Sequence, residues 1–98
     1  MTKTRTTPYD VAAYLTTPAK RAAYLEATLE EFQGDAQALM EALGDIARSE
    51  GMANVAKKSG LSRESLYKTL SGTRKPGFAT ILKIMTALGL QIQVVARP

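Results

Sequence analysis

Apolar positions along most of this chain recur every three or four residues, the spacing that places side chains on one face of an α-helix. A first helix is predicted from Thr17-Pro18, where threonine can cap and proline suits the first helical position, to Gly34. Asp35 can cap a second helix, which Gly51 ends. The two apolar stripes are Ala22, Leu25, Leu29 and Phe32 in the first helix and Leu39, Leu43 and Ile46 in the second.

Three further helices are predicted in the second half of the chain. Two short ones, over residues 52–58 and 62–70, are joined by a turn at Gly60-Leu61. A polar loop over residues 71–77 follows, and the last helix runs from Phe78 to Gly89.

The C-terminal segment has a different period. Residues 91–95 alternate between polar and apolar side chains, which predicts one β-strand. A single strand has an open edge, and pairing with the same strand of a second subunit would cover it, so we expect a homodimer through this strand. The alternative is a tail that packs on the core without pairing. The expected fold class is all-α with this short strand: an N-terminal arm and helical extension over residues 1–33, and a DNA-binding domain over residues 34–98.

Composition limits the function classes. The chain has 98 residues, 45% of them hydrophobic, which suits one globular domain. It contains no cysteine and no histidine, which excludes disulfides and removes the commonest general base and metal ligands. No long apolar run predicts a membrane span, and residues 1–8 do not resemble a secretory signal. We expect a cytoplasmic binding protein that is not an enzyme and holds no cofactor or metal.

Charge is distributed unevenly along the chain. The net charge of +4 is made up of +3 over residues 1–25, −6 over residues 26–50 and +7 over residues 51–98. The basic second half indicates an anionic partner. The acidic stretch faces either solvent or a basic partner, and its like-charge pairs four residues apart, Glu26 with Glu30 and Glu41 with Asp45, weaken the helices locally.

Residues 52–71 meet the requirements of a helix-turn-helix motif. Two helices that cross closely need a small residue on the inner face of the first, and Ala56 is that residue. The turn four residues later needs positive φ, which Gly60 adopts without a Cβ penalty. Leu61 anchors the turn, and Leu66 and Leu70 pack the second helix onto the first. Helical hairpins of this kind also occur in proteins that never touch DNA.

The outward side of the second helix carries the predicted base contacts. Arg63 and Lys68 can donate to guanine or to phosphate, and Tyr67 can hydrogen-bond phosphate or pack on a thymine methyl. Ser62 lies at the leading end of the helix, which enters the major groove first. Glu64 either accepts from a cytosine amino group or only favours the first helical turn.

Phosphate contacts are expected on both sides of this helix. Asn54, near the start of the first motif helix, can offer its amide and nearby backbone N–H groups. In the loop after the second helix, Thr73, Arg74 and Lys75 can hold the backbone of the same strand. Lys57 and Lys58 either add general electrostatic attraction to DNA or only make the protein more soluble. Such binding is steeply salt-dependent.

On these residues the chain resembles known families. Residues 35–95 resemble the lambda-repressor-like (Cro and Xre type) helix-turn-helix domain. The stretches 42–52, 60–67 and 82–90 look closely like the addiction-module antidote family, the antitoxins of HigA-like type. Tyr9-Asp10, Tyr14-Leu15 and Tyr24-Leu25 are similar to that family's leading segment. At residues 78–80 the chain departs from it, since relatives tend to carry an acid after the Phe.

The resemblance implies an antitoxin that neutralises a small basic RelE/ParE-like toxin and represses its own operon. We therefore expect two partners, a double-stranded DNA operator and a cognate toxin, and no membrane. The main alternative is a phage-type or metabolic repressor without a toxin. An enzyme, including a toxin ribonuclease, is disfavoured because no catalytic set converges away from the groove-facing helix. The hypothesis of a pure protein-interaction module does not explain why basic side chains gather around one helix.

Overall fold

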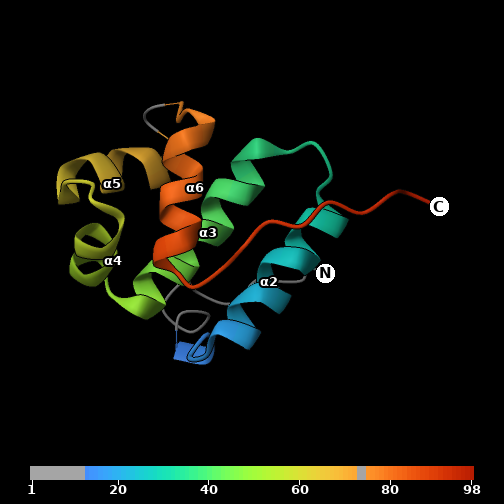
Figure 1. Ribbon diagram of the computed structural model, residues 1–98, viewed down its shortest axis with the longest axis horizontal. Helices are drawn as coiled ribbons and strands as arrows, with labels where there is room; N and C mark the ends of the chain where they lie inside the picture. Colours follow the sequence, from blue (N-terminus) through green and yellow to red (C-terminus); the bar gives the residue numbers. More distant parts are fainter. Residues whose placement is uncertain (1–12, 73–74) are drawn as a thin grey trace.

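The computed structural model describes residues 13–72 and 75–98, and within them five α-helices follow one another (Figure 1). They are α2 (Pro18–Glu31), α3 (Ala36–Glu50), α4 (Met52–Ser59), α5 (Arg63–Leu70) and α6 (Phe78–Ala87). All five predicted helices are present, with ends close to the predicted ones. None of the helices in this part of the chain combines the length and apolarity needed to cross a membrane.

Local caps explain where α2 and α3 begin. The Thr17 hydroxyl accepts a hydrogen bond from the Lys20 backbone N–H at 3.2 Å, and Pro18 occupies the first helical position. The Asp35 carboxylate accepts from the Ala38 N–H at 3.1 Å. Each cap satisfies a first-turn N–H group that has no partner within its own helix.

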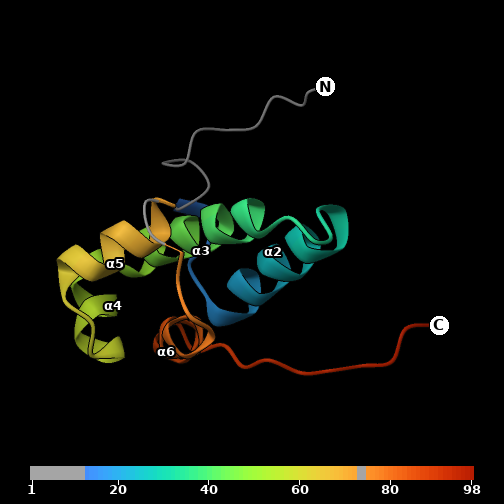
Figure 2. The same cartoon turned by 90° about the horizontal axis from the view of Figure 1, so that it is seen from above.

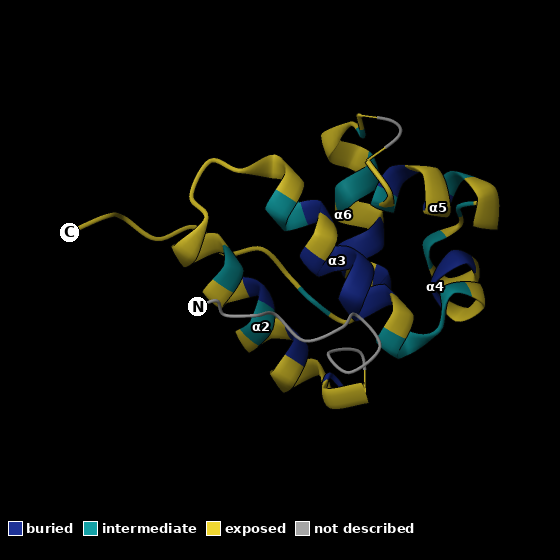
Figure 3. Cartoon of the chain, turned by 180° about the vertical axis from the view of Figure 1, so that it is seen from behind, coloured by how far each residue is buried: buried dark blue, intermediate teal, exposed yellow. Residues whose placement is uncertain are grey.

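Helix α3 lies at the centre of the fold. It contacts α2, α4 and α5, while α4 also contacts α5 and α6 (Figure 2). Buried positions are concentrated on α3 and on the helix faces turned toward it (Figure 3). The buried apolar side chains are Leu15, Leu25, Met40, Ala42, Leu43, Ile46, Ala47, Val55, Ala56, Leu66, Ile84, Met85, Ala87 and Leu88. In contrast, Leu29 and Phe32 of the predicted α2 stripe remain exposed.

Polar contacts add to the packing of α2 on α3. The Tyr24 hydroxyl donates to Asp45 Oδ2 at 2.6 Å, and Arg48 pairs with the other oxygen of the same carboxylate. Asp45 is only 3% exposed, so its charge depends on these partners. The Arg21 side chain, also buried, donates to the Leu15 carbonyl at 3.1 Å.

The predicted β-strand over residues 91–95 is wrong. None of the described residues forms a strand, and the chain after Leu90 runs extended beside α2 without a hydrogen-bonded partner strand (Figure 1). Leu90 packs against the core, whereas Val94 and Val95 are 93% and 81% exposed. An alternating pattern yields a strand only where a neighbouring edge supplies the ladder, and none of the residues that the structure describes forms such an edge beside this segment. The homodimer contact predicted through the strand loses its basis with it.

Candidate nucleic-acid interface

Helices α4 and α5 meet at a tight turn over residues 60–62. Gly60 has a φ of 79°, in the left-handed region that glycine adopts without the penalty of a Cβ. The Ser59 hydroxyl donates to the Ala56 carbonyl and accepts from the Leu61 N–H, both at 3.2 Å. These contacts hold the turn that the glycine position predicted.

The inner sides of α4 and α5 are apolar. Val55 and Leu66 have no exposed surface, and Ala56 is 6% exposed, as a close helix crossing requires. Leu66 is buried as predicted, while Leu61 and Leu70 are only half-buried. Since the inner face of α5 is held against the core, its other face is directed outward.

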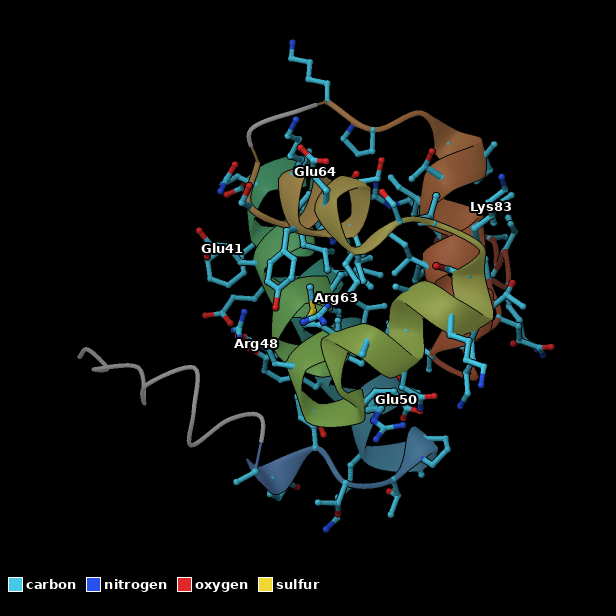
Figure 4. The ribbon with its side chains drawn as sticks, turned by 90° about the vertical axis from the view of Figure 1, so that its left-hand side faces the viewer. Glu41, Arg48, Glu50, Arg63, Glu64 and Lys83 are labelled. Carbon is cyan, nitrogen blue, oxygen red and sulfur yellow. The ribbon has the colours of Figure 1, made fainter. Side chains whose placement is uncertain are left out.

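That outward face carries the side chains predicted to touch DNA. Arg63, Glu64, Tyr67 and Lys68 are all exposed, as is Ser62, whose hydroxyl accepts from the Ser65 N–H at 3.0 Å and so caps α5. In Figure 4, which looks onto this end of the molecule, Arg63 lies near the centre of the view and Glu64 above it. A large partner can reach all of them.

Glu64 and Lys68 form an ion pair along the surface of α5. Lys68 Nζ lies 3.3 Å from Glu64 Oε2, and the two side chains are 46% and 78% exposed. Exposed pairs one turn apart on a helix contribute about 0.3–0.5 kcal/mol. The pair therefore opens easily, and it offsets the negative charge of Glu64 on an otherwise basic face.

Asn54 lies apart from the α5 face, in contact with Glu50. Its amide nitrogen donates to Glu50 Oε2 at 2.5 Å, and Lys58 Nζ lies 2.9 Å from the same oxygen. Arg21 Nη1 is 2.9 Å from the other carboxylate oxygen, Oε1. The side chain of Asn54 is thus partly engaged within the protein, which its position in the sequence did not indicate.

Glu50 is the centre of this contact. The hydrogen bond from Lys58 lowers the pKa of Glu50 below its ordinary value; the charges of Lys58 and Arg21 and the Asn54 hydrogen bond act in the same direction, against the effect of burial. The carboxylate is ionised at neutral pH. It joins α2, the end of α3 and α4.

The predicted phosphate contacts in the loop after α5 fall partly outside the described residues. Thr73 and Arg74 lie outside them. Lys75 is exposed, as is Lys57 on α4. Within the described chain, then, exposed basic side chains occupy α4, α5 and the start of the segment leading to α6.

One family accounts for nearly the whole chain. The family described as a probable addiction module antidote protein matches residues 5–96. The chain belongs to this antidote family. An uncharacterized protein of Haemophilus influenzae is similar, with 48% identity over 86 residues, which cover 88% of this chain and 87% of the relative. No solved structure matches the chain.

Family membership confirms the resemblance to addiction-module antidotes that the sequence showed. The finer likeness, to HigA-like antitoxins and to lambda-repressor-like domains, stays a prediction. An antidote implies a cognate toxin as its partner.

In this antidote, the acids of residues 26–50 divide into two groups. Asp45 and Glu50 are engaged inside the fold, as described above. The remaining acids are exposed: Glu26, Glu30, Glu31, Asp35 and Glu41. Within residues 13–72 and 75–98, no group of three or more histidines, cysteines or acids is arranged to hold a metal ion.

Arg48 is a surface residue that the sequence interpretation missed. It pairs with Asp45, yet its side chain is 45% exposed, and it lines a shallow pocket together with Tyr67 of α5. The signal was available, since Arg48 is the one base among the seven acids of residues 26–50. Its proximity to α5 depends on the packing of α5 on α3, which no local pattern encodes.

Proposed function

We propose that this chain is the antitoxin of a type II toxin-antitoxin module and represses its own operon by binding DNA through α5. It is a cytoplasmic regulator without catalytic activity that neutralises a small basic toxin of RelE/ParE-like type. The observation that carries the DNA-binding part is the outward placement of Arg63, Tyr67 and Lys68 on a helix held from behind by Leu66. Membership of the antidote family supports the antitoxin part.

In this proposal α4 and α5 form a helix-turn-helix motif, with the start of α5 leading into the major groove. Ser62 and Arg63, at that end, read base edges, and Tyr67 packs on a thymine methyl or donates to phosphate. Lys68 leaves its weak pair with Glu64 to reach DNA. Glu64 is then free to accept from a cytosine amino group.

Phosphate contacts complete the surface. Among the described side chains none caps α4, so its first-turn N–H groups can donate to a phosphate. Asn54 uses one amide hydrogen on Glu50 and keeps a second one for the same phosphate. We assign the loop residues Thr73, Arg74 and Lys75 to the backbone of the same strand.

A dimer fits a two-fold operator, with half-sites about one helical turn, roughly 34–36 Å, apart. The alternative, a repressor without a toxin, has no support from an antidote family.

Binding to the duplex upstream of the chain's own gene tests the DNA-reading role of α5. Arg63→Ala should weaken operator binding by roughly 5- to 150-fold, the equivalent of about 1–3 kcal/mol, and leave random DNA unchanged. Lys75→Ala should weaken both DNAs alike and lower the salt slope by about one. Arg97→Ala, which removes the same charge from the C-terminal tail, is the matched control. Equal losses on operator and random DNA for Arg63→Ala would contradict the proposal.

A growth assay tests the antitoxin role. If a small basic protein is encoded beside this chain's gene, as the proposal expects, it is expressed alone and together with the chain. Growth arrest that the chain relieves supports neutralisation. If the neighbouring protein does not arrest growth, or if the chain does not relieve the arrest, the antitoxin role is wrong. The proposal is then reduced to a repressor.

A further inference from the structure

A continuous groove runs along α3. It consists of three pockets of about 250, 240 and 140 Å³ that share their lining residues. The first lies between α2 and α3 and shares Gln37, Glu41 and Asp45 with the second. The second shares its remaining wall with the third, which ends at Tyr67 of α5. The groove therefore spans α2, α3 and α5, and it forms only where these three helices pack together.

The groove combines apolar walls with an acidic rim. Phe32 is 46% exposed at one end of it, and Leu70 lines the other. Asp35 and Glu41 stand on the rim, and no lysine or arginine within residues 13–72 and 75–98 forms an ion pair with either of them. Among the described lining residues Arg48 is the one basic side chain, and its charge is already matched by Asp45.

Gly44 lies in the floor of the groove and breaks a local rule. It sits inside α3, where glycine is about 1 kcal/mol less favourable than alanine. Packing does not require a glycine at this position. A methyl group there would meet Arg48 Nη1 at 3.5 Å and backbone or side-chain atoms of Leu70 at 3.9–4.0 Å, which are ordinary van der Waals contacts. The glycine weakens the helix and leaves space at the floor of the groove. A local cost without a gain in packing indicates that this space serves binding.

We propose that this groove is the docking surface for a cationic, amphipathic segment of the cognate basic toxin, an inference that rests on the antitoxin function proposed above. Lysine or arginine side chains of the segment pair with Glu41 and Asp35. Its apolar side chains cover Phe32 and fill the space above Gly44 in the floor of the groove. The acidic rim repels phosphates, so DNA is not the occupant. Since the groove ends beside Tyr67, a bound toxin lies next to the DNA-reading helix.

Charge reversal tests the rim. The probe is the toxin that the proposed function expects, a small basic protein encoded beside this chain's gene, titrated calorimetrically into the full chain. Glu41→Lys should weaken binding at least tenfold. Glu30→Lys makes the same change of charge on an exposed position of α2 outside the groove and should weaken binding no more than about twofold. Equal effects of the two variants would show that only overall charge matters and would overturn the proposal.

A methyl group tests the floor. Gly44→Ala should keep or raise the melting temperature, because alanine favours the helix, and yet weaken toxin binding at least fivefold by narrowing the space in the floor of the groove. Gly77→Ala is the matched control, since a Cβ there meets nothing within 4 Å and Gly77 has an ordinary φ of −75°. It should leave toxin affinity unchanged. A stable Gly44→Ala variant with wild-type affinity would overturn the proposal.

The outcomes separate this inference from the proposed function. If the wild-type chain binds no basic protein encoded beside its gene, the antitoxin function and the groove assignment are both wrong. A wild-type chain that binds the toxin while Glu41→Lys and Gly44→Ala bind equally well removes only the groove assignment. If Glu41→Lys instead changes the mass of the free protein in sedimentation, the groove joins two copies of this chain, and the toxin assignment is wrong.

Discussion

Replacing Glu50 with glutamine should destabilise the protein in a pH-dependent way. The Glu50 carboxylate accepts from Arg21, Lys58 and Asn54, and the side chains of Arg21 and Glu50 are only 10% and 14% exposed. Glu50→Gln keeps the shape and one acceptor oxygen but removes the charge. The buried arginine then loses its counter-charge while it keeps its hydrogen bond to the Leu15 carbonyl.

The magnitude follows from the exposure of each pair. Breaking a fully buried ion pair costs about 3–5 kcal/mol, and an exposed one about 0–1 kcal/mol. The Arg21 pair is close to the first case and the Lys58 pair, with a lysine side chain 51% exposed, to the second. Because the glutamine oxygen still accepts hydrogen bonds, we expect a loss of about 2 kcal/mol at pH 7. For a domain of this size that lowers Tm by about 8–16 °C.

The sign of the pH dependence follows from the lowered pKa of Glu50. A carboxylate whose pKa is lower in the folded state contributes stability that is complete above its ordinary pKa, about 4.3, and is lost as pH falls through the folded value. The difference between wild type and Glu50→Gln should therefore shrink below about pH 4. Urea unfolding followed by circular dichroism at several pH values measures it.

The matched control is Glu30→Gln, an exposed carboxylate on α2. It should change the free energy of unfolding by less than about 0.5 kcal/mol at every pH. The reasoning fails if Glu50→Gln costs no more than this control at pH 7. It also fails if the loss persists undiminished at pH 3, since a carboxylate whose pKa is lowered by folding contributes less stability once the pH falls below its ordinary pKa.

Substitutions at three further positions, with Val94→Thr as a control, test the fold. Ser62→Ala removes the cap of α5 and should cost about 1 kcal/mol in urea unfolding, with Ser62→Gly closer to wild type. Gly60→Ala forces a Cβ into the left-handed region at φ 79° and should cost about 1–2 kcal/mol; no loss would mean that the turn has another conformation. Tyr24→Phe removes the 2.6 Å hydrogen bond to Asp45 and should cost about 1.5–3 kcal/mol, whereas Val94→Thr, at a 93% exposed position, should leave Tm within about 2 °C.

Helix positions were predictable because their signals are local. Thr17, Asp35 and Ser62 each accept a hydrogen bond from an N–H three residues ahead, so a short stretch of sequence contains both partners. Gly60 has the positive φ that its place between two apolar patterns required. The same reasoning placed Leu66 in the core and, by elimination, Arg63 and Tyr67 outside.

The C-terminal segment shows where local reasoning stops. Alternation over residues 91–95 describes which side chains could share a face of a strand, but a strand exists only where another strand's backbone lies beside it. The described chain brings no such backbone near Val94. The pattern was therefore compatible with a strand and insufficient for one.

By itself the sequence determined the helices, the turn between α4 and α5, the uneven charge and, through its motifs, the antidote family. Only the tertiary structure decided which charges are used internally. Asp45 looked like a surface acid until its partner Tyr24, 21 residues away, bound it. The groove along α3 likewise requires α2 and α5 as walls. Hydrogen bonds within one helical turn are encoded in neighbouring residues, whereas burial and shape depend on which distant segments the core brings together.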